Sequence, residues 1–319
     1  MKQSVITAFL GKTQDRFSEY HDVTNTRERL ELVTQIDGFD GVEVVFPYET
    51  GDPTETQGWM KELNLNFAAI NANIKKEPQW VVGALSRSDR ELRKGAIAII
   101  KGAKDYAKKV GAPLVTVCPL TDGYDNLFQI NYAKTLRNVI DSVGEAAEYL
   151  PEIPLFIEYK FSETRVHCQL DTCAKTILML KEVNNPATGV TIDFGHAMYA
   201  QENPAQSIAL CAELGIDYYL HTNDNDGRFD WDLMGATRNF LHYAEFLFYA
   251  QEYKYDKYFT TDASPRVFDK LEFFNNHAKV SLGIWNLIKS LDRKKYLDLM
   301  EKEDAMGLFK LVREEIYRL

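Results

Sequence analysis

Eight short runs of apolar and β-branched residues recur along the chain, and longer segments with a helical spacing of apolar positions separate them. Each run has the length of a strand, and several begin after Gly or Pro. We therefore predict a strand in each run. The runs are VITAFL (5–10), GVEVVFP (41–47), NFAAINAN (66–73), PLVTVCP (113–119), PLFIEYK (154–160), GVTIDFGH (189–196), DYYLHTND (217–224) and KYFTTD (257–262).

The segments between the runs predict amphipathic helices, and four of them show the pattern clearly: 27–37, 90–111, 134–150 and 173–183. Strands that alternate with helices pair in parallel through crossover connections. Eight such units predict a single α/β domain, a (β/α)8 barrel over residues 1–265. Residues 266–319 then form a C-terminal helical extension, packed on the barrel or on a partner subunit. An open nucleotide-binding sheet is disfavoured, because no glycine-rich phosphate loop follows the first strand.

Charge and composition limit the kinds of molecule that this protein is expected to bind. Among 319 residues, 37 Lys and Arg face 47 Asp and Glu, which gives a net charge of −10. Such a surface repels nucleic acid and acidic lipid, so we expect neither as a partner. We find no apolar run near the ~20 residues of a membrane span, no signal peptide and no CxxC motif. The four Cys residues are therefore expected to be reduced core residues of a cytoplasmic protein.

Acidic residues and an imidazole stand at the ends of four consecutive predicted strands. Glu158 closes the fifth, Asp193 the sixth, His221 the seventh and Asp262 the eighth. In a barrel of this type the active site lies at the carboxyl ends of the strands, so the four side chains should converge. Three carboxylates and one imidazole suit Mn²⁺, Mg²⁺ or Co²⁺. For each residue alone, a capped strand end or a surface ion pair is the competing interpretation.

A second group of ligands lies beside the first. His196 follows Asp193 by three residues, and Asp230 and Asp232 share one side of an extended segment. These three residues predict a second, more exposed cation, with Glu158 or Asp193 as a bridge. The competing interpretation is that the segment DNDGRFDWD is a solvated acidic turn.

Three further residues are candidates for the substrate. Lys160 shares a face with Glu158 and is expected to meet a substrate oxygen, unless it only pairs with a carboxylate. Asn71 ends the third strand and suits sugar hydroxyls, whereas Trp231 suits a pocket wall. Glu43, in the middle of the second strand, is interpreted as an internal hydrogen-bonded carboxylate.

The segments FIEYK, TIDFGHAMYAQENP, LHTNDNDGRFDWD and TTDAS resemble the xylose isomerase-like TIM barrel superfamily, and within it the rhamnose isomerase type. The resemblance covers roughly residues 1–265. It implies two divalent cations per subunit, most simply Mn²⁺, and a homodimer or homotetramer. The implied ligands of the structural metal are Glu158, Asp193, His221 and Asp262, and those of the catalytic metal are His196, Asp230 and Asp232.

Together these features predict a sugar isomerase that interconverts an unphosphorylated aldose and ketose by a metal-assisted 1,2-hydride shift. Lys160 would stabilise charge on oxygen, and Asp262 would assist proton transfer. We see no Arg cluster or glycine-rich nest for a phosphate at the strand ends. The alternatives are a metal-dependent ketose 3-epimerase, with Glu158 as acid and base, and a non-catalytic barrel that binds sugar or metal. The similar epimerases carry Glu where this chain has Asp262, which favours the isomerase.

Overall fold

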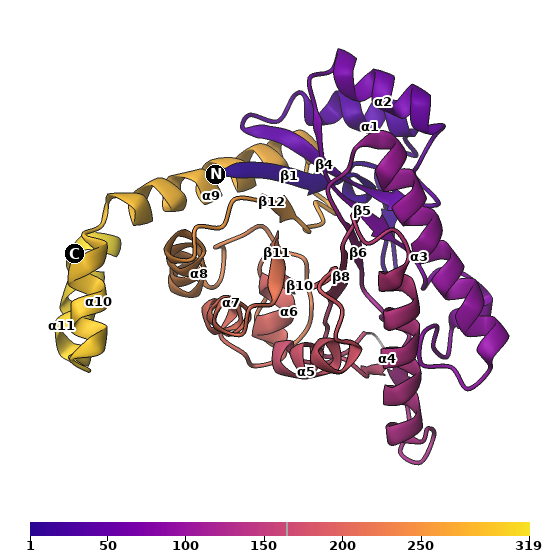
Figure 1. The fold of residues 1–319 in the computed structure, drawn as a ribbon. Coiled ribbons are helices and arrows are strands. Elements are labelled where there is room, and N and C mark those ends of the chain that lie inside the picture. Colours follow the sequence, from indigo (N-terminus) through magenta and orange to yellow (C-terminus); the bar gives the residue numbers. More distant parts are fainter. Residues whose placement is uncertain (164) are drawn as a thin grey trace.

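The computed structural model describes residues 1–163 and 165–319, and its centre is a closed barrel of parallel strands (Figure 1). The order around the barrel is β1-β12-β11-β10-β8-β6-β5-β4, and β4 pairs back to β1. The prediction of a (β/α)8 barrel is confirmed. The barrel strands are β1 (Lys2–Ile6), β4 (Phe39–Phe46), β5 (Asn66–Ala72), β6 (Val115–Val117), β8 (Leu155–Glu158), β10 (Thr188–Asp193), β11 (Asp217–Thr222) and β12 (Tyr258–Thr261).

Helices connect the strands and surround the barrel (Figure 1). They are α1 (Thr26–Val33), α2 (Pro53–Glu62), α3 (Arg90–Val110), α4 (Tyr132–Glu148), α5 (Cys173–Val183), α6 (Phe194–Tyr199), α7 (Pro204–Glu213), α8 (Phe240–Glu252), α9 (Lys270–Ser290), α10 (Arg293–Glu301) and α11 (Ala305–Leu311). Side-chain caps set the starts: Asp89, for example, accepts hydrogen bonds from the backbone of α3, and Thr172 does so for α5. The four clearly patterned helices all form.

Several short elements complete the loops. Two antiparallel pairs occur, β2 (Thr13–Gln14) with β3 (Glu19–Tyr20) and β7 (Gly123–Tyr124) with β9 (His167–Cys168). The remaining turns of helix are η1 (Thr7–Leu10), η2 (Pro78–Trp80) and η3 (Val312–Ile316).

All eight strands end before their predicted runs do, and the first and sixth fall short by the most, three residues or more. The first strand stops at Ile6, and η1 takes up the rest of that run. The sixth stops at Asp193, because the carboxylate of Asp193 accepts a hydrogen bond from the backbone N–H of His196 at 2.8 Å and so begins α6. His196 therefore sits in the first turn of a helix and not on the strand.

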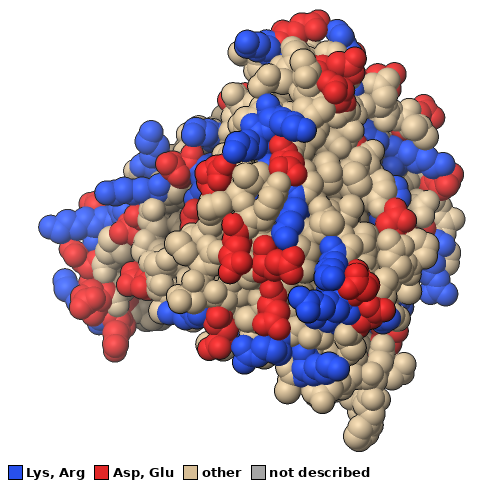
Figure 2. Space-filling view, turned by 45° about the vertical axis from the view of Figure 1, so that its right-hand side comes forward, with Lys and Arg blue, Asp and Glu red and all other residues tan. Residues whose placement is uncertain are grey.

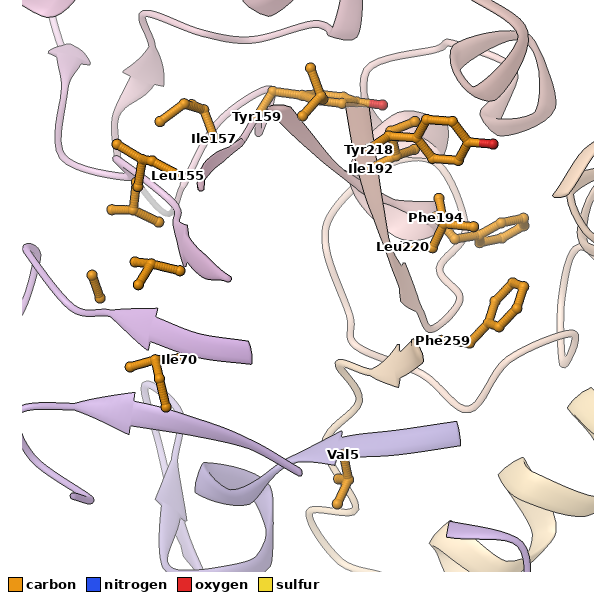
Figure 3. Packing of buried hydrophobic residues seen from close by; sticks show 14 of the residues in the cluster. Val5, Ile70, Leu155, Ile157, Tyr159, Ile192, Phe194, Tyr218, Leu220 and Phe259 are labelled. Atoms are coloured by element: carbon orange, nitrogen blue, oxygen red, sulfur yellow. The ribbon is translucent and has the colours of Figure 1, made fainter. Parts of the chain in front are cut away.

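Alternation along the strands separates the outer core from the barrel interior. Figure 3 shows Leu155 and Ile157 of β8 and Leu220 of β11 pointing away from the ring of strands, toward the helices. The residues between them face inward, where Phe156 and Tyr219 pack edge to face with their ring centroids 6.4 Å apart. Because the side-chain period of a strand is two, the same alternation sends Glu158 and His221 into the interior.

The C-terminal helices lie against the barrel and against α8. In α9, the ring of Phe274 lies 6.5 Å from that of Phe39, and Gln3 donates a hydrogen bond to the carbonyl of Ala278 at 3.4 Å. In α10, the ring of Tyr296 lies 5.9 Å from that of Phe248 in α8. The boundary at residue 265 and any packing on a partner subunit stay predictions.

The surface carries charges of both signs. On the face shown in Figure 2, Lys and Arg side chains lie among Asp and Glu side chains. Ion pairs between partly exposed side chains include that of Lys101 with Glu145 at 2.8 Å. Within the described residues, no helix combines the length and apolar character needed to cross a membrane.

Candidate metal centre

The four residues expected at consecutive strand ends meet inside the barrel. One ligand atom from each of Glu158, Asp193, His221 and Asp262 lies within 4.8 Å of the others. The Nδ1 atom of His221 is 3.5 Å from Oε1 of Glu158 and 3.4 Å from Oδ2 of Asp262. Three of the four residues are buried, and Asp262 is partly exposed. Three carboxylate groups around one imidazole nitrogen form a donor set suited to a hard divalent cation.

Glu43 decides which nitrogen of His221 faces this centre. Its carboxylate is fully buried, and the Nε2 atom of His221 lies 3.0 Å from it. Because a carboxylate only accepts, Nε2 carries the hydrogen, and Nδ1 keeps its lone pair when the ring is neutral. Nδ1 is buried and has no hydrogen-bond partner among the described residues. An unpaired imidazole nitrogen that faces three carboxylates fits a bound cation.

Further hydrogen bonds hold Glu43 and Asp193 in place. Asn71 donates to Glu43 at 2.7 Å, and the hydroxyl of Tyr219 donates to it at 2.9 Å. The amide of Asn223 donates to both oxygens of Asp193, at 3.1 and 3.0 Å. The ligands are therefore oriented by the protein before any cation binds.

Asp193 and His221 show how the buried charges of the first ligand group act on one another. Burial, with added repulsion from Asp262, Asp230 and Glu158, raises the pKa of Asp193 to about 7. Burial opposes the charge on His221, but Glu43 and Glu158 raise its pKa well above the usual value. Crowded carboxylates of this kind are relieved by a cation, either a proton or a metal.

A second ligand group adjoins the first and shares Asp193 with it. Ligand atoms of Asp193, His196 and Asp230 lie within 4.8 Å of one another. Nδ1 of His196 donates to the carbonyl of Tyr159 at 2.9 Å, which leaves Nε2 facing Asp230 at 3.2 Å. Burial works against the charged ring, but Asp193 and Asp230 raise the pKa of His196 to about 10. The Oδ1 atom of Asp230 is buried without a hydrogen-bond partner among the described residues.

The third residue expected at this second site is Asp232, which lines the same pocket as His196 and Asp230. Burial, with repulsion from Asp230 and Asp262, raises the pKa of Asp232 well above its usual value. Asp232 is absent from the sets of ligand atoms that the described residues bring within 4.8 Å. Its carboxylate is 3.6 Å from the guanidinium of Arg266, and its backbone is left-handed, with φ of 48°. This turn breaks the extended geometry from which a shared side with Asp230 was inferred. Coordination by Asp232 stays a prediction.

Lys160 forms ion pairs beside the second group. Its ammonium lies 2.9 Å from Asp230 and 2.7 Å from Glu163. Burial acts against its charge, but these carboxylates and that of Asp232 raise the pKa of Lys160 well above the usual value. The two ion pairs match the competing interpretation of this residue. They leave one of its three N–H donors for another group.

A pocket of about 730 Å³ opens above both groups, and its lining includes Lys160, Asn71 and Trp231. The indole of Trp231 is 44% exposed and donates to Asp226 at 2.9 Å. The amide nitrogen of Asn71 is committed to Glu43, as described above. Contact of these residues with a substrate stays a prediction.

Two residues of the site were missed in the sequence. Cys118, at the end of the fourth strand, was interpreted as core, yet its thiol lies within 4.8 Å of ligand atoms of Glu158 and His196. Asn223 follows the seventh strand and was passed over, although it positions Asp193. Position at a strand end was the available signal for both. Glu43 is a hydrogen-bonded internal carboxylate, as predicted.

The family profile described as xylose isomerase-like TIM barrel matches residues 30–276, more than half of the chain. The chain belongs to this family. Xylose isomerases of Cereibacter sphaeroides and Brucella canis are each 26% identical to it, over 167 and 177 residues. These alignments cover 50% and 54% of this chain but only 38% and 40% of the relatives. The chain thus aligns with less than half of the length of these relatives.

Solved structures of the xylose isomerase-like fold superpose on nearly the whole chain. A D-tagatose 3-epimerase-like protein has a TM-score of 0.69 at 20% identity, covering 90% of this chain and 98% of its own. D-psicose 3-epimerase from Clostridium cellulolyticum H10, solved with D-tagatose, has a TM-score of 0.69 at 14% identity, with coverage of 90% and 99%. At these identities the likeness shows the fold alone. The rhamnose isomerase type stays a prediction.

Proposed function

We propose that this protein is a metal-dependent sugar isomerase that interconverts an unphosphorylated aldose and its ketose. The observation that carries the proposal is the pair of adjoining ligand groups, which share Asp193 and lie at the floor of one pocket. Membership of the xylose isomerase-like family and the names of its curated relatives support the same chemistry.

The residues divide into those that hold cations and those that act on the sugar. Glu158, Asp193, His221 and Asp262 would hold one cation. His196 and Asp230, with Asp193 and the less well placed Asp232, would hold a second. Bound divalent cations, Mn²⁺ in the simplest case and otherwise Mg²⁺ or Co²⁺, supply Lewis-acid polarisation of sugar oxygens.

In the aldose-to-ketose direction, the hydrogen on C2 moves with its electron pair to C1, and the proton of the O2 hydroxyl is transferred to O1. The N–H of Lys160 that its two ion pairs leave over stabilises the oxygen on which negative charge develops. Asp262 is the most exposed carboxylate of the first ligand group, with 17% of its side chain exposed, and it carries the proton between the two oxygens. Asn71 and Trp231 line the wall against the rest of the sugar.

A ketose 3-epimerase is the second candidate. The observation that favours it is the pair of carboxylates, Glu158 and Asp262, on either side of His221, which offers two acid-base groups to one substrate carbon. The likeness of the fold to two ketose 3-epimerase structures agrees with this candidate without deciding it.

Product NMR in D₂O separates the candidates. The protein, stripped of metal and reloaded with Mn²⁺, is incubated with a panel of free aldoses and ketoses. A hydride shift gives aldose-ketose interconversion without deuterium at C1. Deuterium at C3 of a ketose identifies the epimerase instead, and the absence of turnover across the panel favours a barrel that only binds sugar or metal.

Asp230→Asn tests the second cation. The change removes one negative charge from a buried group, and we expect loss of turnover in a variant that still unfolds cooperatively in chelator, at a lower temperature because Lys160 and His196 lose a partner. Full activity of the variant would remove the second cation from the proposal.

Other parts of the interpretation extend this proposal. They are closer kinship to the rhamnose isomerase type, a homodimer or homotetramer and a cytoplasmic location.

A further inference from the structure

Cationic side chains from several loops line the pocket above the metal centre, and three of them have no acidic partner. The five are Arg16, Lys75, Lys76, Lys160 and Arg266. Lys160 and Arg266 are each paired with an aspartate of the segment around Trp231. No ion pair to a described residue occurs for the other three.

Lys75 is the most enclosed of these three. It follows β5, and Asn73 fixes the loop by accepting hydrogen bonds from the backbone N–H groups of Lys75 and Lys76, both at 3.1 Å. Lys76 is exposed and stacks over the ring of Tyr48 at 4.1 Å. Lys75 is half-buried, and no described residue accepts a hydrogen bond from its ammonium group or offers a ring beneath it. Its charge is near enough to Cys118 to act against the rise that burial causes in the pKa of that thiol.

The acids on the pocket wall outside the metal centre are already used. Glu49 is bound by Arg29 at 2.6 Å. Glu163 is bound by Lys160 at 2.7 Å. Asp15 accepts from the backbone of its own hairpin and from the hydroxyl of Tyr20 at 2.7 Å. A half-buried lysine in a pocket whose other acids are already paired favours a ligand that brings an anionic group.

We infer that Lys75 binds a carboxylate of the substrate, so that the sugar processed at the metal centre is a sugar acid, such as a uronate. This rests on the proposed function, because it places the other end of that sugar at Lys75. A single ammonium suits a carboxylate, whereas phosphate sites favour forked Arg contacts or several converging backbone N–H groups. A uronate is also an unphosphorylated aldose, as the proposed reaction requires.

The experiment compares sugars that differ only in this charge. Binding of D-glucose and D-glucuronate, and of D-galactose and D-galacturonate, is measured by calorimetry on the Mn²⁺-loaded protein. We expect the acid to bind at least about tenfold more tightly than its neutral partner, which corresponds to about 1.4 kcal/mol. The preference should shrink as salt is raised, because salt screens the ion pair.

Three variants test whether Lys75 causes the preference for the sugar acid. Lys75→Gln should abolish it, Lys75→Arg should keep most of it, and the matched control Lys76→Gln should keep it fully. Melting curves in chelator show whether Lys75→Gln is folded. A preference that survives in folded Lys75→Gln overturns the assignment, and so does equal binding of acids and neutral sugars by the wild type.

Two further results separate this inference from the proposed reaction. Lys75-dependent binding of D-glucose 6-phosphate that exceeds the binding of D-glucuronate overturns the choice of carboxylate. Isomerisation of neutral sugars without preference for the acids supports the reaction and overturns the inference. Lys75-dependent binding of uronates without any turnover supports the inference and contradicts the reaction.

Discussion

Glu43→Gln is the substitution that tests most directly whether the barrel interior is built for a cation. Glu43 does not belong to the ligand group, but its carboxylate accepts the hydrogen bond from Nε2 of His221, with the nitrogen and oxygen 3.0 Å apart. Glutamine keeps the shape of the side chain but removes its charge. Asn71, Tyr219 and His221 all donate hydrogen bonds to the native carboxylate. The amide nitrogen of glutamine is itself a donor, so it cannot accept from the residues that face it.

The expected magnitude follows from these contacts. Three hydrogen bonds to a buried charge become at best two to a neutral oxygen, and bonds to charged groups are worth about 1.5–3 kcal/mol against about 1 for neutral ones. Loss of an outer partner of a metal-binding His typically costs about 10–100-fold in metal affinity. We therefore expect Glu43→Gln to weaken Mn²⁺ binding by about 10–100-fold, or about 1.4–2.7 kcal/mol.

The assay is titration of chelator-stripped protein with Mn²⁺, with free Mn²⁺ read from its electron paramagnetic resonance signal. Glu49→Gln is the matched control, since it neutralises another pocket carboxylate that is bound to Arg29 and does not contact His221. The reasoning is refuted if folded Glu43→Gln binds Mn²⁺ as the wild type does, or if both variants weaken binding equally.

Three further results are expected. Removal of metal by chelation should lower the unfolding temperature, and Mn²⁺ should raise it again, roughly with the logarithm of the free Mn²⁺ concentration; no change on reloading would argue against a cation site. Gly195→Ala should weaken Mn²⁺ binding, because its Cβ would stand 2.7 Å from Oδ1 of Asn223, which orients Asp193. Gly58→Ala, in open space on α2, should leave binding unchanged and stabilise the fold by up to ~1 kcal/mol. Burial lowers the pKa of His277 to about 3, so protonation near pH 5 favours the unfolded chain, whose His has a pKa of about 6.5. Stability should therefore fall by about 2 kcal/mol more from pH 7 to pH 5 in the wild type than in His277→Gln, as measured by urea unfolding, and equal slopes would contradict the burial argument.

Much of the site could be read from the sequence because a strand repeats every two residues and parallel strands end at one edge. Glu158, Asp193 and His221 each close an apolar run, so their convergence required only that the runs be strands of one barrel. The strand register then aligns Asp193 directly with His221. Local pattern and topology together determined the first ligand group.

The conformations of the loops, and the ion pairs that their side chains form, depend on the tertiary structure. The extended segment predicts that Asp232 shares a side with Asp230. In the structure the backbone of Asp232 is itself left-handed, and its carboxylate lies toward Arg266. Lys75 lies in no sequence motif. That its ammonium has no acidic partner follows from the structure, in which Glu49 pairs with Arg29 and Glu163 pairs with Lys160. A loop conformation depends on contacts between residues far apart in the chain, and no repeat along the sequence encodes these contacts. The sequence by itself therefore determined the barrel and the candidate cation ligands at its strand ends, whereas only the tertiary structure decided how the charges of the pocket above them are paired.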